Sequence, residues 1–417
     1  MKIAIIGSGI SGLGAAYLLN SAGHDITVYE KNHYIGGHSR TMEVEMEGKK
    51  IPVDTGFIVF NYRNYPELTG MFKHLDVAVE KSDMSFGASI KNGWFEYGTQ
   101  KTSAIFTQKR NLLRLQFWKM MRDIFKFNAN AKKYINSNIT LGECLEELKL
   151  GEWFKNYYLL AMGGAIWSTP TNGMLGFPAR SFIRFFDNHG LITIKDQPQW
   201  YTVTGGSREY VKKLTASFKD KILLSCGAEK VIRENNKVTV IDTNGNKTEF
   251  DQVVFACHSD QVMKILQNPT KDEKSIIGAV KYQPNKAVLH CDESFMPKRK
   301  GAWASWVYLS ENEKDNRPQV CLSYWMNRLQ NIKSKKPIIV TLNPSRQPEK
   351  SKIFDEHIFE HPVFDEPAIG AQEKVCKIQG LNNTWYCGAY LKYGFHEDGF
   401  ASGVKVAEKL GATIPWR

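Results

Sequence analysis

The sequence predicts an α/β protein in which a Rossmann-type dinucleotide-binding domain is interleaved with an α+β substrate domain. The N-terminus reads as a strand, a glycine-rich turn and a helix, which is how such a domain begins. The chain has 417 residues, too many for one simple core. Strand and glycine patterns return far along the chain, with neither an internal repeat nor a low-complexity linker between them.

The N-terminal unit has a period of about 30 residues, as expected for βαβ. Residues 2–6 read as a buried strand, residues 11–22 as a helix and residues 25–31 as a second strand. Residues 104–135 read as mostly helical and rich in aromatics. Residues 222–257 read as strands around an Asn-Gly hairpin signal. The chain then closes with the strand TWYCGA and the helix ASGVKVAEKL.

These elements predict how the two domains share the chain. We expect residues 1–75, 202–265 and 378–417 to form the dinucleotide-binding domain. Residues 76–201 and 266–377 then form the substrate domain.

Composition narrows the class of protein. Hydrophobic residues make up 42% and charged residues 24%, as in ordinary soluble enzymes. The sequence has neither an apolar run of about 18 residues nor a secretory signal, so we expect a cytoplasmic protein. The seven cysteines form no C-x-x-C pair, which argues against a disulfide framework and against a metal site.

The net charge of +12 favours anionic partners. The basic clusters at 298–300 and 333–336 are short, and no nucleic-acid fold motif accompanies them, so we expect no nucleic-acid partner. A solvated basic surface is the favoured interpretation. The alternatives are an anionic substrate or a peripheral position on an acidic membrane surface, at the inner face of the membrane.

Gly7, Gly9 and Gly12 form the pattern G-x-G-x-x-G between the first strand and the first helix. The first glycine permits the tight turn, the second lets the backbone approach a pyrophosphate, and the third lets helix and strand pack closely. The helix N-terminus, with Ile10 and Ser11, then offers free amides to the phosphates. All five residues are candidate cofactor-binding residues.

Glu30 ends the second strand, about 20 residues beyond the glycines, as the dinucleotide fingerprint requires. A carboxylate there accepts hydrogen bonds from a ribose diol and repels a 2′-phosphate, which leaves NAD or FAD. We place Lys31 in the same site. A second glycine pair, Gly36 and Gly37, suits a longer ligand, and Arg40 is a candidate phosphate partner. A plain glycine turn is the alternative.

The segment IIGSGISGLGAAYLL…VYEKNHYIGGHSRT resembles the N-terminus of the flavin-containing amine oxidase, phytoene desaturase and protoporphyrinogen oxidase superfamily. The resemblance implies a glutathione-reductase-like fold of the amine oxidase subtype with bound FAD. The usual pattern has arginine after the double glycine, where this chain has His38, followed by Ser39 and Arg40.

The resemblance extends along the chain. VDTGF matches the segment that brings Gly56, beside Phe57, towards the isoalloxazine, and TGGSREYV matches the turn back into the FAD domain. GAEKVIRENNKVTV matches the strand whose backbone near Val231 contacts adenine. YCGAYLKYGFHEDGFASGVKVA matches the C-terminal flavin segment. The resemblance implies that Gly388 approaches the phosphate–ribitol end of FAD. It also implies that a helix begins near Phe400 to Ser402, just after Gly399, and points its N-terminus at the flavin pyrimidine.

Two further segments, YQPNKAVLHCDESFMP and AWASWVY, resemble bacterial predicted NAD/FAD-binding proteins often encoded beside cyclopropane fatty-acid synthases. This resemblance implies a fatty acyl or similar lipid substrate, dehydrogenated or isomerised by hydride transfer to flavin N5. Lys286 aligns with the lysine that holds a water near N5 in many amine oxidases, and a surface strand lysine is the alternative. The FAD is expected to be non-covalent, because Cys376 lies too close to Gly388 for the usual attachment.

An apolar substrate would need an apolar tunnel to the flavin, and we expect Phe117, Phe125, Trp167 and Phe182 to line it. The helix around Phe117 has two interpretations: it packs an apolar face in the core, which is favoured, or it contacts a membrane. Its apolar side would carry Leu112, Leu113, Phe117, Trp118, Met121 and Phe125, and its polar side Arg110, Arg114, Lys119, Arg122 and Lys126.

Two rival functions and one false motif complete the sequence predictions. A flavin amine oxidase would place aromatic rings before the flavin, with Tyr390, Tyr393 and Phe395 as candidates. A flavin-binding protein without catalysis is the other rival.

HIFEH (357–361) matches a zinc peptidase pattern, but the prolines that follow leave no room for the helix that this pattern needs, so we expect loop histidines.

Overall fold

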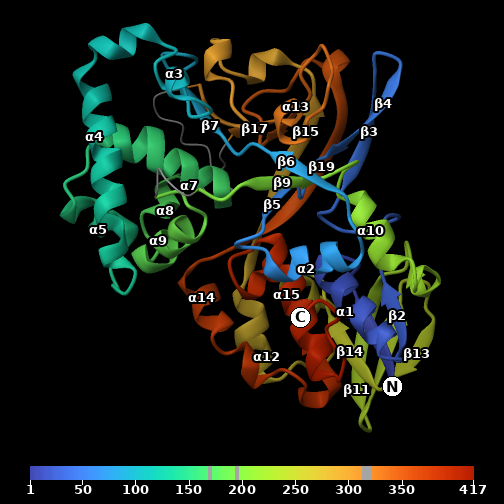
Figure 1. The fold of residues 1–417 in the computed structure, drawn as a ribbon. Helices are drawn as coiled ribbons and strands as arrows, with labels where there is room; N and C mark the ends of the chain where they lie inside the picture. The colour runs from blue at the N-terminus through green and yellow to red at the C-terminus, as the bar shows by residue number, and fades with distance from the viewer. Residues whose placement is uncertain (168–170, 193–196, 312–320) are drawn as a thin grey trace.

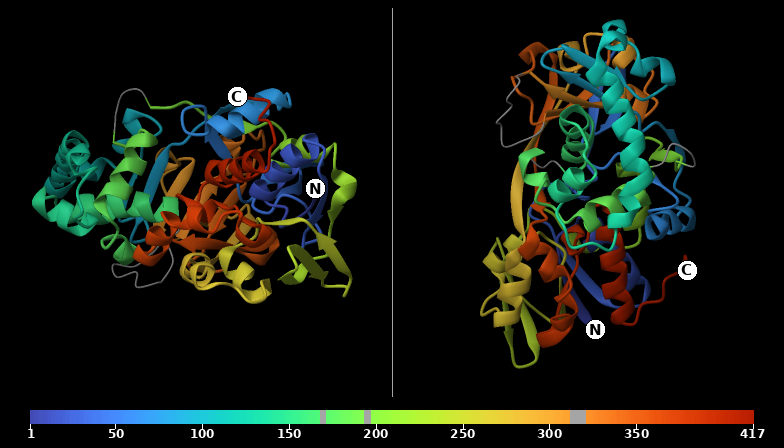
Figure 2. Two further views of the ribbon diagram at one scale, coloured as in Figure 1. Left: turned by 90° about the horizontal axis from the view of Figure 1, so that it is seen from below. Right: turned by 90° about the vertical axis from the view of Figure 1, so that its left-hand side faces the viewer.

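The computed structural model describes residues 1–167, 171–192, 197–311 and 321–417, and its fold is mixed α/β, which confirms the predicted class (Figure 1). Figures 1 and 2 show three parts. One part holds both termini and a parallel sheet, a second holds a large mixed sheet, and a third is a group of helices beside the large sheet.

The parallel sheet has five strands, and β1 lies at its centre between β2 and β14. Segments far apart in the sequence are neighbours here, since β20 from the C-terminal part pairs with β14. The strands lie in the order β10 (Ile222–Leu223), β2 (Asp25–Tyr29), β1 (Lys2–Ile6), β14 (Gln252–Phe255) and β20 (Thr384–Tyr386).

Both faces of this sheet are covered, because side chains alternate along each strand. Ile3 and Ile5 pack with one layer, whereas Ala4 and Ile6 pack with the other. The first layer contains the helices α1 (Ile10–Ser21), α2 (Pro66–His74), α10 (Arg208–Thr215) and α15 (His396–Lys409). The second contains β11 (Ala228–Glu234), β12 (Lys237–Asp242), β13 (Lys247–Phe250), α11 (Ser259–Ile265), α12 (Lys271–Ile276) and α14 (Glu366–Gln372).

The large sheet has seven strands and is mixed, since β7 joins β16 in parallel while the other pairs are antiparallel. Its strands lie in the order β19 (Ile353–Val363), β15 (Lys281–His290), β18 (Ile339–Leu342), β17 (Cys321–Trp325), β16 (Trp306–Ser310), β7 (Phe86–Ile90) and β8 (Phe95–Gly98). Smaller elements connect the two sheets: β3 (Thr41–Met46), β4 (Lys49–Asp54), β5 (Val59–Asn61), β6 (Val79–Ser82), β9 (Trp200–Val203) and α13 (Met326–Leu329).

The helical part confirms the helical character expected for residues 104–135. A single apolar cluster joins Phe117, Phe154 and Phe182 to the large sheet. No helix in the described ranges combines the length and hydropathy needed to cross a bilayer. The helices are α3 (Thr102–Ile105), α4 (Leu115–Asn130), α5 (Leu141–Glu147), α6 (Glu152–Phe154), α7 (Leu160–Trp167), α8 (Thr171–Met174) and α9 (Ala179–Asn188).

Two sequence predictions need correction. The histidines of HIFEH do not lie in a loop: they belong to β19, whose pairing with β15 runs from Lys281 to His290. The last helix begins at His396 and not near Phe400, because Asp398 accepts the amides of Tyr393 and Phe395 and so fixes an earlier start.

Candidate functional site

The turn between β1 and α1 is shaped by its three glycines. Gly7 has φ +108°, and a Cβ there would lie 3.0 Å from the Ala256 carbonyl oxygen. A Cβ on Gly12 would lie 2.0 Å from the Gly7 carbonyl oxygen. A Cβ on Gly9, by contrast, would meet nothing within 4 Å. The first and third glycines are therefore required by packing, and the second borders open space where a ligand can approach.

The N-terminus of α1 faces this open space. Gly9 caps the helix, and no side chain accepts a hydrogen bond from its first turn. The amides of Ile10, Ser11 and Gly12 have no acceptor inside the helix, as in every α-helix. These amides and the helix dipole make a site suited to a phosphate anion.

Glu30 is 5% exposed and lies directly beneath the turn. Its Oε2 accepts hydrogen bonds from the Ser8 amide (3.0 Å) and the Ser8 hydroxyl (2.6 Å), and its Oε1 accepts one from the Asn32 amide (2.8 Å). A carboxylate has about four acceptor positions, so one position on Oε1 is left for a ribose hydroxyl. The neighbouring Lys31 is exposed.

The second glycine pair packs against the first turn. Gly36 donates its amide to the Ser8 carbonyl (3.0 Å) and forms an isolated parallel bridge with Gly9. Gly37 has φ +58°, and a Cβ there would lie 3.2 Å from the Gly9 Cα. The two glycine-rich segments therefore form one continuous backbone surface.

His38, the residue after this pair, lies in a cluster of aromatic and histidine rings. Its ring centroid is 4.9 Å from Phe359, 5.5 Å from His361 and 6.2 Å from His258. Burial holds the pKa of His38 well below its usual range and lowers the pKa of His361 to about 4. The cluster is therefore neutral at pH 7. The alternating spacing of His357, Phe359 and His361 is typical of residues on one face of a strand. This spacing is the sequence signal from which the ring cluster could have been predicted.

Arg40 does not occupy the expected phosphate position. Both of its terminal nitrogens bind the carboxylate of Asp355, at 2.6 and 3.1 Å, and one also contacts Thr55. This two-donor face is the one that would have matched a phosphate. Arg40 instead ties the start of β3 to β19, and we leave it out of the proposed cofactor site.

A chain of hydrogen bonds joins the segments that follow the glycines. The Tyr210 hydroxyl is hydrogen-bonded both to Ser39 and to Nε2 of His396, the latter at 2.7 Å. Phe57 stacks on His396 with a centroid distance of 3.8 Å and an interplanar angle of 10°. Burial lowers the pKa of His396 to about 3. The sequence analysis identified Ser39 and Phe57 but missed Tyr210 and His396.

Gly56 and Asp54 hold the VDTGF segment in place. A Cβ on Gly56 would lie 2.1 Å from the His38 carbonyl oxygen. Asp54 is 1% exposed and accepts hydrogen bonds from the amide of Ser207 (2.9 Å) and from Nε2 of Gln330 (3.0 Å). Burial raises its pKa to about 6, partly offset by hydrogen bonds from Thr41 and Ser207. Asp54 thus joins the Gly-Gly turn to α13.

The start of α15 lies beside the start of α1. A Cβ on Gly399 would lie 3.0 Å from Oγ of Ser11. The expected roles of two neighbours differ in the structure. Phe400 is fully buried and packs against Gly14 and Trp416, and Ser402 accepts the amide of Gly388 at 2.8 Å. A Cβ on Gly388 would strike the ring of Tyr390, so this glycine is required by packing.

The first turn of α15 is acidic, which modifies the expected helix-dipole effect. Glu397 accepts the amides of Glu67 and Leu68, both at 2.9 Å, and so caps α2. Burial raises the pKa of Glu397 to about 7 and also raises that of Asp398. When these carboxyl groups are ionised, their negative charge offsets the positive end of the helix dipole.

Two predicted residues have contacts within the chain. Lys286 lies opposite the exposed Ile358 in the β15–β19 pair, on the face away from Phe359, and its ammonium contacts Glu356 at 3.0 Å. The predicted role beside N5 is therefore not supported. Val231 is fully buried, and its carbonyl accepts the amide of Gln267 at 2.9 Å. A second acceptor position remains on that oxygen, and the backbone contact with adenine stays a prediction.

The predicted tunnel residues are divided between core and surface. Phe117 and Phe182 are fully buried, whereas Phe125 is 55% exposed and cannot line an interior wall. Trp167 ends α7, but its side chain lies outside the described residues. The tunnel stays a prediction. Of the candidate aromatic rings, Phe395 stacks on Phe185 at 4.7 Å.

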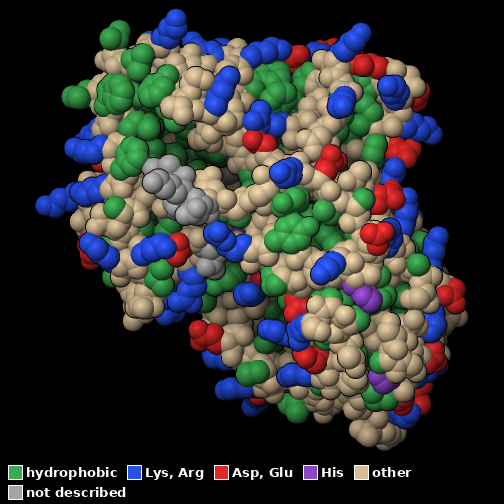
Figure 3. Space-filling model, viewed as in Figure 1, with side chains coloured by type: hydrophobic (Ala, Val, Ile, Leu, Met, Phe, Trp, Pro, Cys, Tyr) green, Lys and Arg blue, Asp and Glu red, His purple; other side chains and the backbone are tan. Residues whose placement is uncertain are grey.

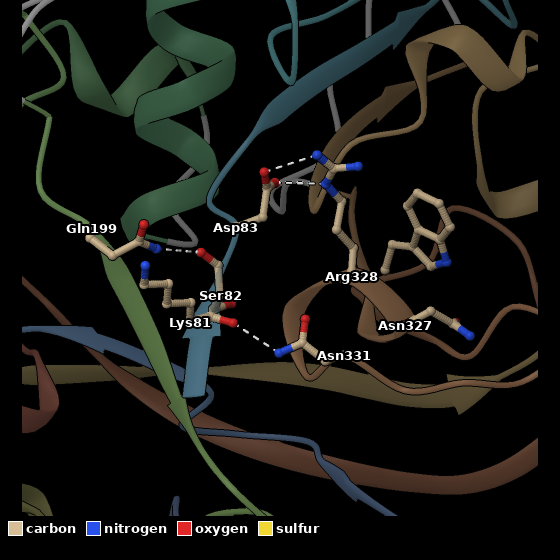
Figure 4. A pocket seen from close by; sticks show the side chains of 8 residues that line it. Lys81, Ser82, Asp83, Gln199, Asn327, Arg328 and Asn331 are labelled. Carbon is tan, nitrogen blue, oxygen red and sulfur yellow. Dashed lines mark hydrogen bonds and ion pairs between the residues drawn. The ribbon is translucent and has the colours of Figure 1, made fainter. Parts of the chain in front are cut away.

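A separate polar pocket of about 520 Å³ lies between β6 and α13 (Figure 4). Asp83 contacts Arg328 across it at 2.9 Å. Burial alone would raise the pKa of Asp83, but hydrogen bonds from Arg328, Ser85 and Ser305 outweigh it and hold that pKa below its usual range. Its wall residues bond to one another, and we assign it no role. They are Lys81, Ser82, Asp83, Gln199, Trp325, Asn327, Arg328 and Asn331.

Metal binding finds no support in the described residues, where no three His, Cys, Asp or Glu side chains are grouped to hold an ion. The histidines of HIFEH lie on a strand, and the helix that the zinc peptidase pattern needs is not formed.

Solved structures of other proteins share this fold. A fatty acid isomerase from P. acnes that produces CLA has the same fold, with a TM-score of 0.70, 18% identity and 98% of each chain covered. Cyclohexylamine oxidase from Brevibacterium oxydans IH-35A gives a TM-score of 0.67 and 14% identity, with 98% of this chain and 99% of that chain covered. At these identities, both likenesses show the fold alone.

Sequence comparisons give the family. A 4,4'-diapophytoene desaturase from Staphylococcus aureus (strain MRSA252) is 31% identical over 96 residues, which cover 20% of this chain and 19% of that relative. The match thus spans about a fifth of the relative's own length. The family model described as flavin containing amine oxidoreductase matches residues 10–334, which is most of the chain. Membership of this family implies a flavin cofactor. The chain therefore belongs to the flavin containing amine oxidoreductases.

Proposed function

We propose that this chain is an oxidoreductase that binds FAD without a covalent bond and acts on a largely apolar, fatty acyl or similar substrate. The observation that carries the proposal is the uncapped N-terminus of α1 behind Gly9, with the buried carboxylate of Glu30 beside it. An anion site and a ribose acceptor so close together suit an adenine dinucleotide. Membership of the flavin containing amine oxidoreductases supports a flavin as the other part of this dinucleotide.

FAD fits these residues better than a shorter ligand would. The amides of Ile10, Ser11 and Gly12 would hold the diphosphate, and the remaining acceptor position of Glu30 would hold a ribose hydroxyl. The Gly36–Gly37 pair extends the backbone surface beyond Gly9. No cysteine is assigned a covalent role, and dissociable FAD is the simplest form consistent with this surface.

When bound, flavin supplies an acceptor for a hydride from a substrate C–H bond. The chain must then orient the substrate and exclude water. Phe57 stacks on His396, the ring of Phe359 lies 4.9 Å from that of His38, and burial keeps both histidines neutral at pH 7. A neutral, apolar surrounding suits a hydrocarbon better than a cationic amine.

Three observations support a lipid substrate. The helical part has an apolar core that includes Phe117, Phe182 and Phe186. Two similar proteins are named as a fatty acid isomerase and a diapophytoene desaturase. The net charge of +12 suits a substrate that ends in a carboxylate or phosphate.

The test is anaerobic titration of the purified yellow protein with an unsaturated fatty acid and, separately, with a primary amine. We expect the fatty acid either to bleach the flavin absorbance or to be recovered with a shifted double bond, and heat to release free FAD. Bleaching by the amine alone would support the rival amine oxidase. Neither bleaching nor isomerisation with any candidate would favour the non-catalytic rival. A colourless protein that binds NAD and not FAD would overturn the cofactor.

A further inference from the structure

Large apolar side chains are exposed on one face of α4 and on the short helix η1 (Lys109–Leu113) before it. Leu113 is 92% exposed and Leu115 80%. Figure 3 shows hydrophobic side chains gathered over the part of the surface where α3 and α4 lie in Figure 1. We call the set the α4 apolar face; its members are Leu112, Leu113, Leu115, Trp118 and Phe125.

This face is separate from the core-forming side of the same helix. Phe117, Met120 and Phe127 are at most 2% exposed and pack in the main apolar cluster. Leu115, Trp118 and Phe125 follow the 3.6-residue period on another side of the helix. The core is therefore complete without them, and their exposure needs another explanation.

The surroundings of the α4 apolar face are strongly basic. Between residues 109 and 133 the only acidic side chain is Asp123, which is fully buried and bonded to Arg122 and to the Gly151 amide. The basic residues of the same segment are Lys109, Arg110, Arg114, Lys119, Arg122, Lys126, Lys132 and Lys133.

We propose that the α4 apolar face docks on a lipid bilayer that contains acidic headgroups. Leucine, tryptophan and phenylalanine side chains would enter the boundary between headgroups and acyl chains, while the lysines and arginines would contact the acidic headgroups. A second copy of this chain is a poor occupant, because two such segments would bring like charges together.

The position of α4 agrees with this role. Figure 2 shows α4 at the outer side of the helical part, away from the parallel sheet that carries the glycine turn. Docking there would leave the glycine-rich site unobstructed. An apolar substrate of the kind proposed above would then be taken from the bilayer by the helical part, a consequence that rests on the proposed function. The docking itself does not depend on flavin.

Vesicle co-sedimentation of the full chain tests the proposal. The probes are vesicles of phosphatidylcholine alone and of phosphatidylcholine with phosphatidylglycerol. The variant Leu113→Glu/Leu115→Glu removes the most exposed apolar side chains. Its matched control is Ile358→Glu/Leu381→Glu, which changes two other exposed apolar residues, 62% and 56% exposed. Lys119→Glu/Lys126→Glu tests the charges, and Lys271→Glu/Lys274→Glu on α12 is its control.

We expect the chain to bind the acidic vesicles and to lose about tenfold or more of that affinity in the Leu113/Leu115 and Lys119/Lys126 variants. Both controls should bind within about twofold of the parent, since they lie outside the segment. Equal binding by all variants would overturn the proposal. So would a dimer in solution that the Leu113/Leu115 variant dissociates. Flavin content, measured on every variant, separates a failure of docking from a failure of the proposed cofactor.

Discussion

Gly403 of α15 lies so close to α1 that a Cβ there would stand 2.1 Å from the carbonyl oxygen of Ser11. Gly399, one turn earlier, would place a Cβ 3.0 Å from the Ser11 hydroxyl oxygen. The helix from the end of the chain therefore supports the turn that contains Gly9. A side chain at position 403 would separate the two helices.

Replacing Gly403 with Ala should lower the free energy of unfolding by about 1–3 kcal/mol, the usual cost of an extra group in a packed core. Flavin content should fall with it. Gly370 on α14 is the matched control, because a Cβ there meets nothing within 4 Å. Gly370→Ala should be neutral or stabilise by up to about 1 kcal/mol. Urea unfolding curves measure both, and equal curves would contradict the close contact.

Replacing Glu30 with Ala should weaken FAD binding by about 1.5–3 kcal/mol, as expected for hydrogen bonds to a charged group. The change also leaves the Ser8 amide and hydroxyl without their acceptor. Glu30→Arg should bind FAD still less well and should not create useful NADP binding. Glu234→Ala, at the exposed end of β11, is the control. Dilution followed by flavin fluorescence gives the affinity, and full retention in the Glu30 variants would remove Glu30 from the site.

Stability should fall in acid because of His396. Its pKa is about 3 in the folded chain and about 6.5 in the unfolded chain. The unfolded chain therefore binds one more proton between these values, and the stabilisation present above pH 6.5 is lost as the pH falls. His396→Gln should reduce the slope of unfolding free energy against pH by up to about 1.4 kcal/mol per pH unit. The exposed His33 is the control for the same substitution. An unchanged slope in His396→Gln would refute this prediction.

Arg233 and Glu273 form a buried ion pair in the layer beneath the parallel sheet. Two nitrogens of Arg233 contact the carboxylate at 2.5 and 3.0 Å, and the Tyr386 hydroxyl also donates to it at 2.7 Å. Arg233→Ala should cost about 3–5 kcal/mol, because it leaves a buried carboxylate unpaired. Lys264→Ala breaks the exposed pair with Asp260 and should cost less than about 0.5 kcal/mol. Similar losses in urea unfolding would argue against the buried pair.

The sequence predicted the parts of the site that depend on local pattern. Gly7, Gly12 and Glu30 lie where the strand–turn–helix pattern places them, because each role depends on residues close in the sequence. The site around His38 depends on the position of β19, which no local pattern defines. For the same reason the partner of Arg40 is Asp355, a residue more than 300 positions away.

The exposed and buried sides of α4 were also hard to predict. Its aromatic residues occur on both sides, so periodicity alone could not decide which side packs on the core. The structure divides them: Phe117 is buried and Phe125 is exposed. The core interpretation is therefore confirmed for one side of the helix. The other side presents apolar residues to the surroundings, and membrane contact stays a prediction.

The contact between α1 and α15 also bears on how the protein is made. A ribosome adds roughly 5–20 residues per second, and nearly four hundred residues separate Ile10 from His396. The first helix therefore waits on the order of tens of seconds for its partner. During that delay the nascent Gly9 turn lacks the support of Gly399 and Gly403. Cofactor capture should accordingly follow the synthesis of α15, and ribosome-bound chains halted before residue 384 should retain no flavin.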